Sequence, residues 1–174
     1  MKLLILIFIA IIPYSCCRHN ETEFIKDKSW IPFDSISFTV YRSNSDILDT
    51  LYVSEVDSGM REIGFECVSL HEYKSCKLKS RKFQSFDIGV LLDCSSINFD
   101  INYLGNYYKF YYSSDNSNPF SNVYDAKFFD SLTFRGNNYA KVLLLKDNPQ
   151  TFNVFYNKQG ILRYVIDSDT FDLR

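Results

Sequence analysis

The segment INFDINY, residues 97–103, has the clearest repeating pattern in the chain. Its apolar and polar side chains alternate one by one, with Ile97, Phe99, Ile101 and Tyr103 apolar and Asn98, Asp100 and Asn102 polar. Because successive side chains of a strand point to opposite faces, this pattern predicts an antiparallel strand with one buried face and one wet face.

The same alternation recurs on both sides of this segment. Residues 36–41 and 86–94 alternate in the same way, and turn-forming groups such as DSG at 57–59, GN at 105–106 and DSD at 167–169 separate further apolar stretches. No long helical pattern is present. We therefore expect an all-β domain of about nine to eleven short strands, either an antiparallel sandwich or a curved, barrel-like meander.

The aromatic run YYKFYY at residues 107–112 permits two interpretations. Tyr and Phe are strong strand formers, and rings with a hydroxyl group fit well at the rim of a sheet. Aromatic side chains on both faces of a strand could instead form a binding surface. The residues of that possible surface are Tyr107, Tyr108, Phe110, Tyr111 and Tyr112.

Composition limits the class of protein. The 174 residues are 46% hydrophobic and 17% aromatic, which provides a substantial core and argues against general disorder. The formal net charge is −2. The basic segment KSCKLKSRK at residues 74–82 lacks interleaved aromatic residues, so we interpret it as a solvated hairpin loop and expect no nucleic-acid partner.

The chain contains few of the residue types that catalysis needs. His19 and His71 are its two histidines, too few for a multi-histidine zinc site, and its six glycines form no phosphate-binding loop. Cys67 and Cys76 could pair across a predicted turn, leaving Cys94 as a buried small hydrophobe. We assign no catalytic, cofactor-binding or metal-binding residue, although a carboxylate pair remains open because its convergence depends on the fold.

The N-terminus, MKLLILIFIAIIPYSCC, has the parts of a secretory signal peptide. Lys2 precedes an apolar run over residues 3–12, which is too short to span a bilayer. We predict a leader over residues 1–15, a polar tether over 16–29 and a single β-rich domain over 30–174.

The sequence PYS before Cys16 resembles a bacterial lipobox. The phrase FYNKQGILRY at residues 155–164 is similar to the closing strand pair of small envelope lipoproteins of Bacteroidota. The resemblance implies lipid attachment at Cys16, with Cys17 as the fallback acceptor, and a lipid anchor of the palmitate type. It further implies a location in the cell envelope, at the outer membrane, with the membrane face left open.

Three short motifs resemble the Bacteroidota O-glycosylation pattern of Asp, then Ser or Thr, then an apolar residue. They place the acceptor hydroxyl on Ser35, Thr50 and Ser131. Turn formers at strand starts produce the same pattern, so that reading stays open as well.

Together these features predict a membrane-anchored envelope lipoprotein with a non-catalytic β domain. Its membrane contact would be the N-terminal lipid, and its further partner an unidentified protein, glycan or lipid. Two alternatives remain: a structural accessory subunit of an envelope complex, and a carboxylate-dependent hydrolase.

Overall fold

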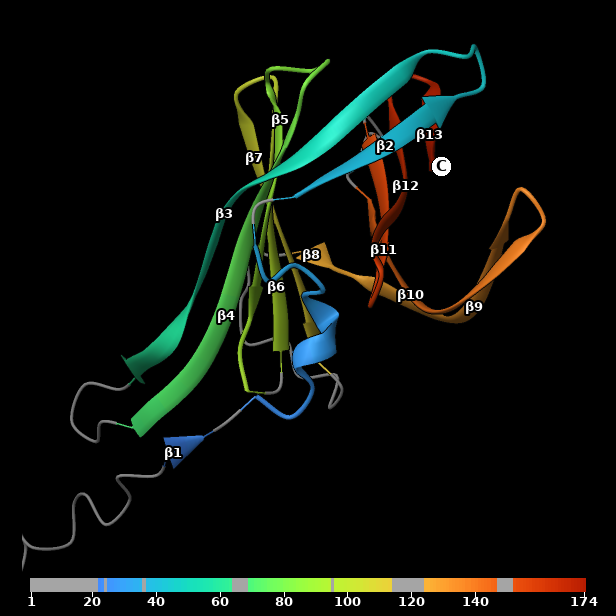
Figure 1. Cartoon of the computed structure of the whole chain (residues 1–174). Helices are drawn as coiled ribbons and strands as arrows, with labels where there is room; N and C mark the ends of the chain where they lie inside the picture. Colours follow the sequence, from blue (N-terminus) through green and yellow to red (C-terminus); the bar gives the residue numbers. More distant parts are fainter. Residues whose placement is uncertain are drawn as a thin grey trace, which may run out of the picture.

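The computed structural model describes residues 22–23, 25–35, 37–63, 69–94, 96–113, 124–146 and 152–174. Its main element is one curved sheet (Figure 1). A single short 3-10 helix, η2 (Lys28–Trp30), precedes the long strands in the described part of the chain. The strands are β1 (Thr22–Glu23), β2 (Phe38–Ser43), β3 (Leu48–Ile63), β4 (Ser69–Ser80), β5 (Phe86–Leu92), β6 (Ser96–Tyr103), β7 (Asn106–Ser113), β8 (Tyr124–Asp125), β9 (Lys127–Phe134), β10 (Asn137–Lys146), β11 (Phe152–Asn157), β12 (Gly160–Ile166) and β13 (Asp169–Leu173).

The strand order makes the sheet nearly close on itself. Going round the sheet, the order is β8-β7-β6-β5-β4-β3-β2-β13-β12-β11-β10-β9, so the path begins at β8 and ends at β9. These two strands are separated by Ala126 alone. The chain therefore joins the two ends of the path, and the seam between β7 and β8 is held by two parallel residue pairs.

The all-β prediction is confirmed, and the arrangement is the barrel-like one. β2 to β7 and β9 to β13 are antiparallel to their neighbours, while β1 and β8 are parallel additions of two residues each. Residues 97–103 lie in β6, and along this strand buried residues alternate with partly or fully exposed ones, as predicted.

Three tight hairpins set the register of the sheet. Leu104-Gly105, Arg135-Gly136 and Asp167-Ser168 each join paired strands with both residues at positive φ. Two-residue loops with positive φ at both positions match the right-handed twist of antiparallel strands, which explains their use here.

Two predicted turns are instead parts of strands. The DSG group at 57–59 lies inside β3. Gly59 is paired with Tyr73 of β4, whose ring would lie 3.4 Å from a Cβ at position 59, and the Tyr73 hydroxyl donates a hydrogen bond to Asp57. The basic segment at 74–82 lies largely in β4, with Lys77 paired opposite Glu55. Cross-strand packing and charge pairing thus override the local turn preference.

Aromatic side chains fill the interior of the sheet. Phe99 meets Tyr156 edge to face at 5.1 Å, and Tyr41 meets Tyr164 in the same way at 5.1 Å. Each buried tyrosine must also satisfy its hydroxyl group, and Tyr41 does so by donating to the carbonyl of Ile161 at 2.8 Å. Burial raises the pKa of the Tyr41, Tyr156 and Tyr164 hydroxyl groups, which therefore stay protonated.

The buried carboxylate of Asp49 ties opposite parts of the sheet together. It accepts hydrogen bonds from Ser80 Oγ at 2.6 Å, from Tyr164 Oη at 2.6 Å and from the backbone N–H groups of Thr50 and Lys82. Only 1% of Asp49 is exposed, so these donors replace the water it loses on folding.

The Asp49→Ala variant tests this assignment. It would leave the buried hydroxyl groups of Tyr164 and Ser80 without their acceptor and remove the bond to the Lys82 N–H. We expect the free energy of unfolding to fall by about 2 to 4 kcal/mol. Urea unfolding followed by circular dichroism measures the change. Asp130→Ala is the control because Asp130 is exposed on β9, and equal losses in the two variants would contradict the role of Asp49.

The folded domain begins before Trp30, so the predicted tether is too long. β1 pairs with β4, and Ile25 and Ile31 are buried in the core. Phe33 packs against Gly160. Only glycine fits there, because φ is 100° and a Cβ at this position would lie 2.8 Å from the Phe33 ring. Residues 25–33, blue in Figure 1, thus lie between the two sides of the sheet. Lys26 and Ile31 are hydrogen-bonded to Cys94 and to Lys74 of β4, whereas Asp27 pairs with Lys158 in the turn between β11 and β12.

No helix among the described residues has the length and apolar character needed to cross a membrane.

Candidate functional site

A pocket of about 270 Å³ lies where residues 25–30 meet the end of the sheet. The N-terminal segment provides one side of it, and the turn between β5 and β6 provides another. The lining residues are Ile25, Lys26, Asp27, Trp30, Leu92, Asp93, Cys94, Ser96, Ile97, Tyr112, Phe128, Lys141 and Lys158.

Three aromatic rings form a continuous wall of the pocket. Tyr112 of β7 stacks on Phe128 of β9, with ring centroids 5.6 Å apart and an interplanar angle of 18°. On its other side Tyr112 meets Trp30 at 6.2 Å. The wall therefore spans the seam of the sheet and offers an apolar surface that bends between Tyr112 and Trp30, whose ring planes are 43° apart.

Basic side chains outnumber acidic ones around this wall. Lys158 pairs with Asp27, and its Nζ lies 6.0 Å from the centre of the Trp30 ring. Lys26 and Lys141 line the same pocket, and neither forms an ion pair with another described residue. With three lysines against two aspartates, the pocket favours an anionic ligand.

Lys141 is held in an unusual backbone conformation. Its φ of 53° lies in the left-handed region, in the middle of β10, and the pairing of β10 with β9 skips this residue. A residue with a side chain adopts this conformation at a cost of about 1 to 2 kcal/mol. Strain of this kind is found more often at functional sites than elsewhere, which supports a role for Lys141 in the pocket.

Both pocket carboxyl groups are held in their charged form. The hydrogen bond from Lys158 is the main cause that lowers the pKa of Asp27 to about 2. Burial raises the pKa of Asp93, but hydrogen bonds from the Cys94 backbone and from Arg61 outweigh it and leave the pKa below its ordinary value. Carboxylates that remain ionised are poor proton donors, so this pair does not meet the requirement of a general acid in hydrolysis.

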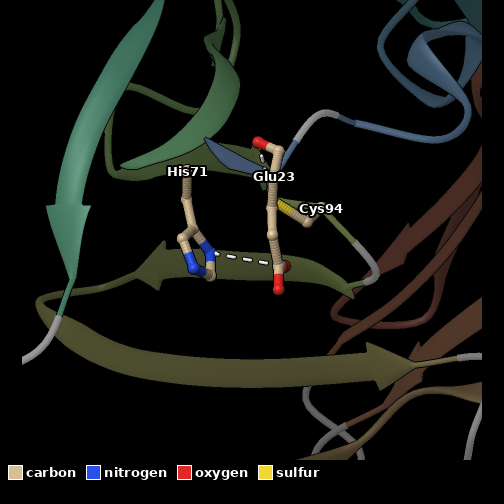
Figure 2. A group of neighbouring side chains, drawn as sticks. All are labelled: Glu23, His71 and Cys94. Carbon is tan, nitrogen blue, oxygen red and sulfur yellow. Dashed lines mark hydrogen bonds and ion pairs between the residues drawn. The ribbon is translucent and has the colours of Figure 1, made fainter. Parts of the chain in front are cut away.

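Next to the pocket, three potential metal ligands converge from distant parts of the sequence. Figure 2 shows His71 of β4, Glu23 of β1 and Cys94 after β5 pointing toward one another. The ligand atoms of these three residues all lie within 4.8 Å of each other. His71 Nδ1 is 3.9 Å from Glu23 Oε2 and 3.6 Å from Asp93 Oδ1.

The Cys94 thiol is protonated in this arrangement. Burial, followed by the hydrogen bond and the negative charge of Asp93, raises its pKa to about 11. The thiol donates to the backbone carbonyl of Glu23 at 3.4 Å. Cys94 is thus a small buried group, as predicted, but one that faces two polar neighbours.

The aromatic run predicted as a possible binding surface divides between the two faces of β7. Phe110 is buried in the core, and Tyr108 meets Phe152 edge to face at 4.9 Å. Tyr112 reaches the pocket, whereas Tyr107 is 76% exposed. Tyr111 is partly buried, so the five residues form no single surface.

The predicted disulfide does not agree with the structure. Cys76 has a free, buried thiol, and burial raises its pKa to about 12. The predicted pairing required a turn between the two cysteines, but β4 is continuous from Ser69 to Cys76, a length of about 23 Å at 3.3 Å per residue. Cys67 itself lies outside the described residues, as do Cys16 and Cys17.

The three proposed glycosylation positions differ in exposure. Ser35 and Ser131 are exposed, and Ser131 lies on β9. Thr50 is only partly exposed, and the aspartate of its motif, Asp49, is the buried carboxylate described above. The Asp49-Thr50-Leu51 match is therefore explained by the core.

Sequence reasoning missed the main residues of both sites. The pattern around Trp30 indicates only the start of the domain, and no motif marks Lys141 or Lys158 as a site residue. Glu23, His71 and Cys94 have no motif spacing, because they are brought together by the pairing of β1 with β4 and the position of the β5 end.

No family model matches the chain, no curated protein matches its sequence, and no solved structure matches its fold.

The pair of Asp27 and Lys158 predicts a specific pH dependence. Because the folded pKa of Asp27 is lowered, the pair stabilises the fold above the ordinary pKa of 3.8, and this contribution is lost as the pH falls toward 2. Carbon NMR of the aspartate carboxyl groups should show Asp27 titrating near 2, and at a higher pH in Lys158→Met, where the hydrogen bonds from Ser29 still lower the pKa. Lys146→Met should leave the titration unchanged, and an Asp27 pKa near 3.8 in the unaltered protein would contradict the pairing.

Proposed function

We propose that this protein is an envelope lipoprotein whose barrel-like domain binds a small amphipathic anion. In this proposal the lipid on Cys16, or on Cys17 as the fallback, holds the domain at the membrane. The pocket beside Trp30 holds the apolar body of the ligand against the aromatic wall. Lys26 and Lys141 bind its carboxylate or phosphate.

The pocket is the observation that carries the ligand proposal. Its volume of about 270 Å³ is close to the lower end of the usual range for small-molecule sites, about 300 to 1,000 Å³, so the ligand is small. An apolar wall bordered by two lysines without ion-pair partners among the described residues matches a ligand with one apolar and one anionic end. A single-chain fatty acid has this chemistry.

The alternatives have less support. An accessory subunit would use the aromatic run of β7 as an interface, but alternate rings of that run point into the core. A hydrolase would need a proton donor, whereas the pKa values of both pocket carboxyl groups are lowered. We therefore propose a binding role without catalysis for the domain.

The anchor is tested by metabolic labelling of the full-length chain with a palmitate analogue in a bacterial host. We expect label on the unaltered protein and on Cys17→Ala, and no label on Cys16→Ala. The reverse result in the two variants would assign the lipid to Cys17. An unlabelled unaltered protein would contradict the lipoprotein proposal.

Ligand binding can be followed through Trp30, because it is the single tryptophan of the chain and lies in the pocket wall. Titration with decanoate should change the Trp30 emission, whereas decanol, which has the same chain length without the charge, should bind at least about 10-fold more weakly. We expect this difference because decanol has no carboxylate and cannot form the ion pair that decanoate forms with a lysine in this partly desolvated site.

The Lys141→Gly variant separates binding from stability. Glycine tolerates the positive φ at this position, so the variant should be at least as stable as the unaltered protein. It should nevertheless bind decanoate about 5- to 10-fold more weakly, since it lacks one cation. Lys146→Gly is the matched control on β10, outside the pocket lining. Equal binding of decanoate and decanol, or undiminished decanoate binding by Lys141→Gly, would contradict the proposal.

A further inference from the structure

We propose that Glu23, His71 and Cys94 form a binding site for a divalent transition-metal ion, with Zn²⁺ as the ion that fits best. The site borders the ligand pocket, because Cys94 lines both, but the inference does not depend on ligand binding.

The spacing of the donor atoms suits a tetrahedral ion. Zn–N, Zn–O and Zn–S bonds of about 2.0 to 2.3 Å place neighbouring ligand atoms about 3.3 to 3.8 Å apart. The 3.9 Å between His71 Nδ1 and Glu23 Oε2 is close to this range, and all three donors are within 4.8 Å of each other. The Glu23 side chain is half exposed and can rotate to complete the approach.

The donor types select the class of metal. One imidazole nitrogen, one sulfur and one carboxylate oxygen match the preferences of Zn²⁺ and related transition metals. Ca²⁺ and Mg²⁺ prefer sites made of oxygen atoms, so this set disfavours them. Three protein ligands leave a fourth position for water or for a donor from a bound molecule.

The neighbouring residues hold the ligands in place. β1 pairs with β4 so that Glu23 and His71 are direct partners in the register. His71 Nε2 is 3.1 Å from Ser69 Oγ, which leaves Nδ1 directed at Glu23 and Asp93. Asp93 is fixed in turn by Arg61 and by the Cys94 N–H at 2.8 Å. A metal-bound histidine typically has a hydrogen bond at the ring nitrogen that does not bind the metal, and an oriented carboxylate beside it.

The cluster also has a charge imbalance that a cation would relieve. Glu23 and Asp93 both face the Nδ1 side of His71, and Arg61 is the base that pairs with Asp93. The charged groups around His71 are therefore Glu23, Asp93 and Arg61. Glu72, the next residue of β4, accepts a hydrogen bond from the Ile25 N–H and pairs with Lys28. A divalent ion that displaces the thiol proton adds a net charge of +1, which balances the one negative charge, that of Glu23, left over after Arg61 has paired with Asp93.

The test uses the purified full-length chain in detergent, stripped with a chelator and reloaded with ZnCl₂ or CoCl₂. We expect about one tightly bound Zn²⁺ per chain by elemental analysis and a thiolate-to-cobalt charge-transfer band with Co²⁺. His71→Gln and Cys94→Ser should each weaken binding at least about 100-fold, and Cys94→Ser should also abolish the cobalt band.

Matched variants control for other cysteines and histidines. His19→Gln, Cys67→Ser and Cys76→Ala should retain the metal and the cobalt band. His71→Gln should still bind decanoate, because His71 is outside the pocket lining, so loss of the metal site and loss of the ligand site can be told apart. A chain that binds no Zn²⁺, or that binds it equally well after His71→Gln in a folded variant, would overturn the proposal.

Discussion

The docking of residues 22–23 and 25–33 against the sheet is the interaction on which both candidate sites depend. This segment supplies Ile25, Asp27 and Trp30 to the pocket and Glu23 to the metal cluster. It is held on one side by the pairing of β1 with β4 and on the other by the hydrogen bond from Tyr156 to the carbonyl of Trp30. Without this docking the pocket would lose the side that Ile25 and Trp30 provide, and the metal cluster would lose Glu23.

The docked segment in turn requires a rigid interior to rest on. Edge-to-face aromatic contacts fill that interior, and each hydroxyl that they bury must find a partner. Tyr164 finds one in Asp49 and Tyr156 in the docked segment itself. The rings of the core tyrosines therefore provide buried apolar area, and their hydroxyl groups determine which segments lie against one another.

Sequence periodicity predicted the strands well because alternation is a local property. β6 and the hairpin turns at Leu104-Gly105 and Asp167-Ser168 could be predicted from neighbouring residues. The full length of β3 and β4 could not, since Gly59 lies in a strand only through its pairing with Tyr73 of the facing strand. The sites were beyond local reading for the same reason. Glu23 meets His71 and Cys94 only after long-range strand pairing. Lys141 stands out only by its positive φ, which no sequence pattern predicts.

The seam between β7 and β8 has a kinetic consequence. It is the shortest pairing on the closed path of described strands, and backbone junctions with few hydrogen bonds open before the rest of a fold does. Tyr112 and Phe128 stand on its two sides, so opening the seam also separates the rings of the pocket wall. If the proposed ligand enters between these rings, entry and local unfolding would be one motion, and an occupied pocket would slow amide hydrogen exchange most at this junction.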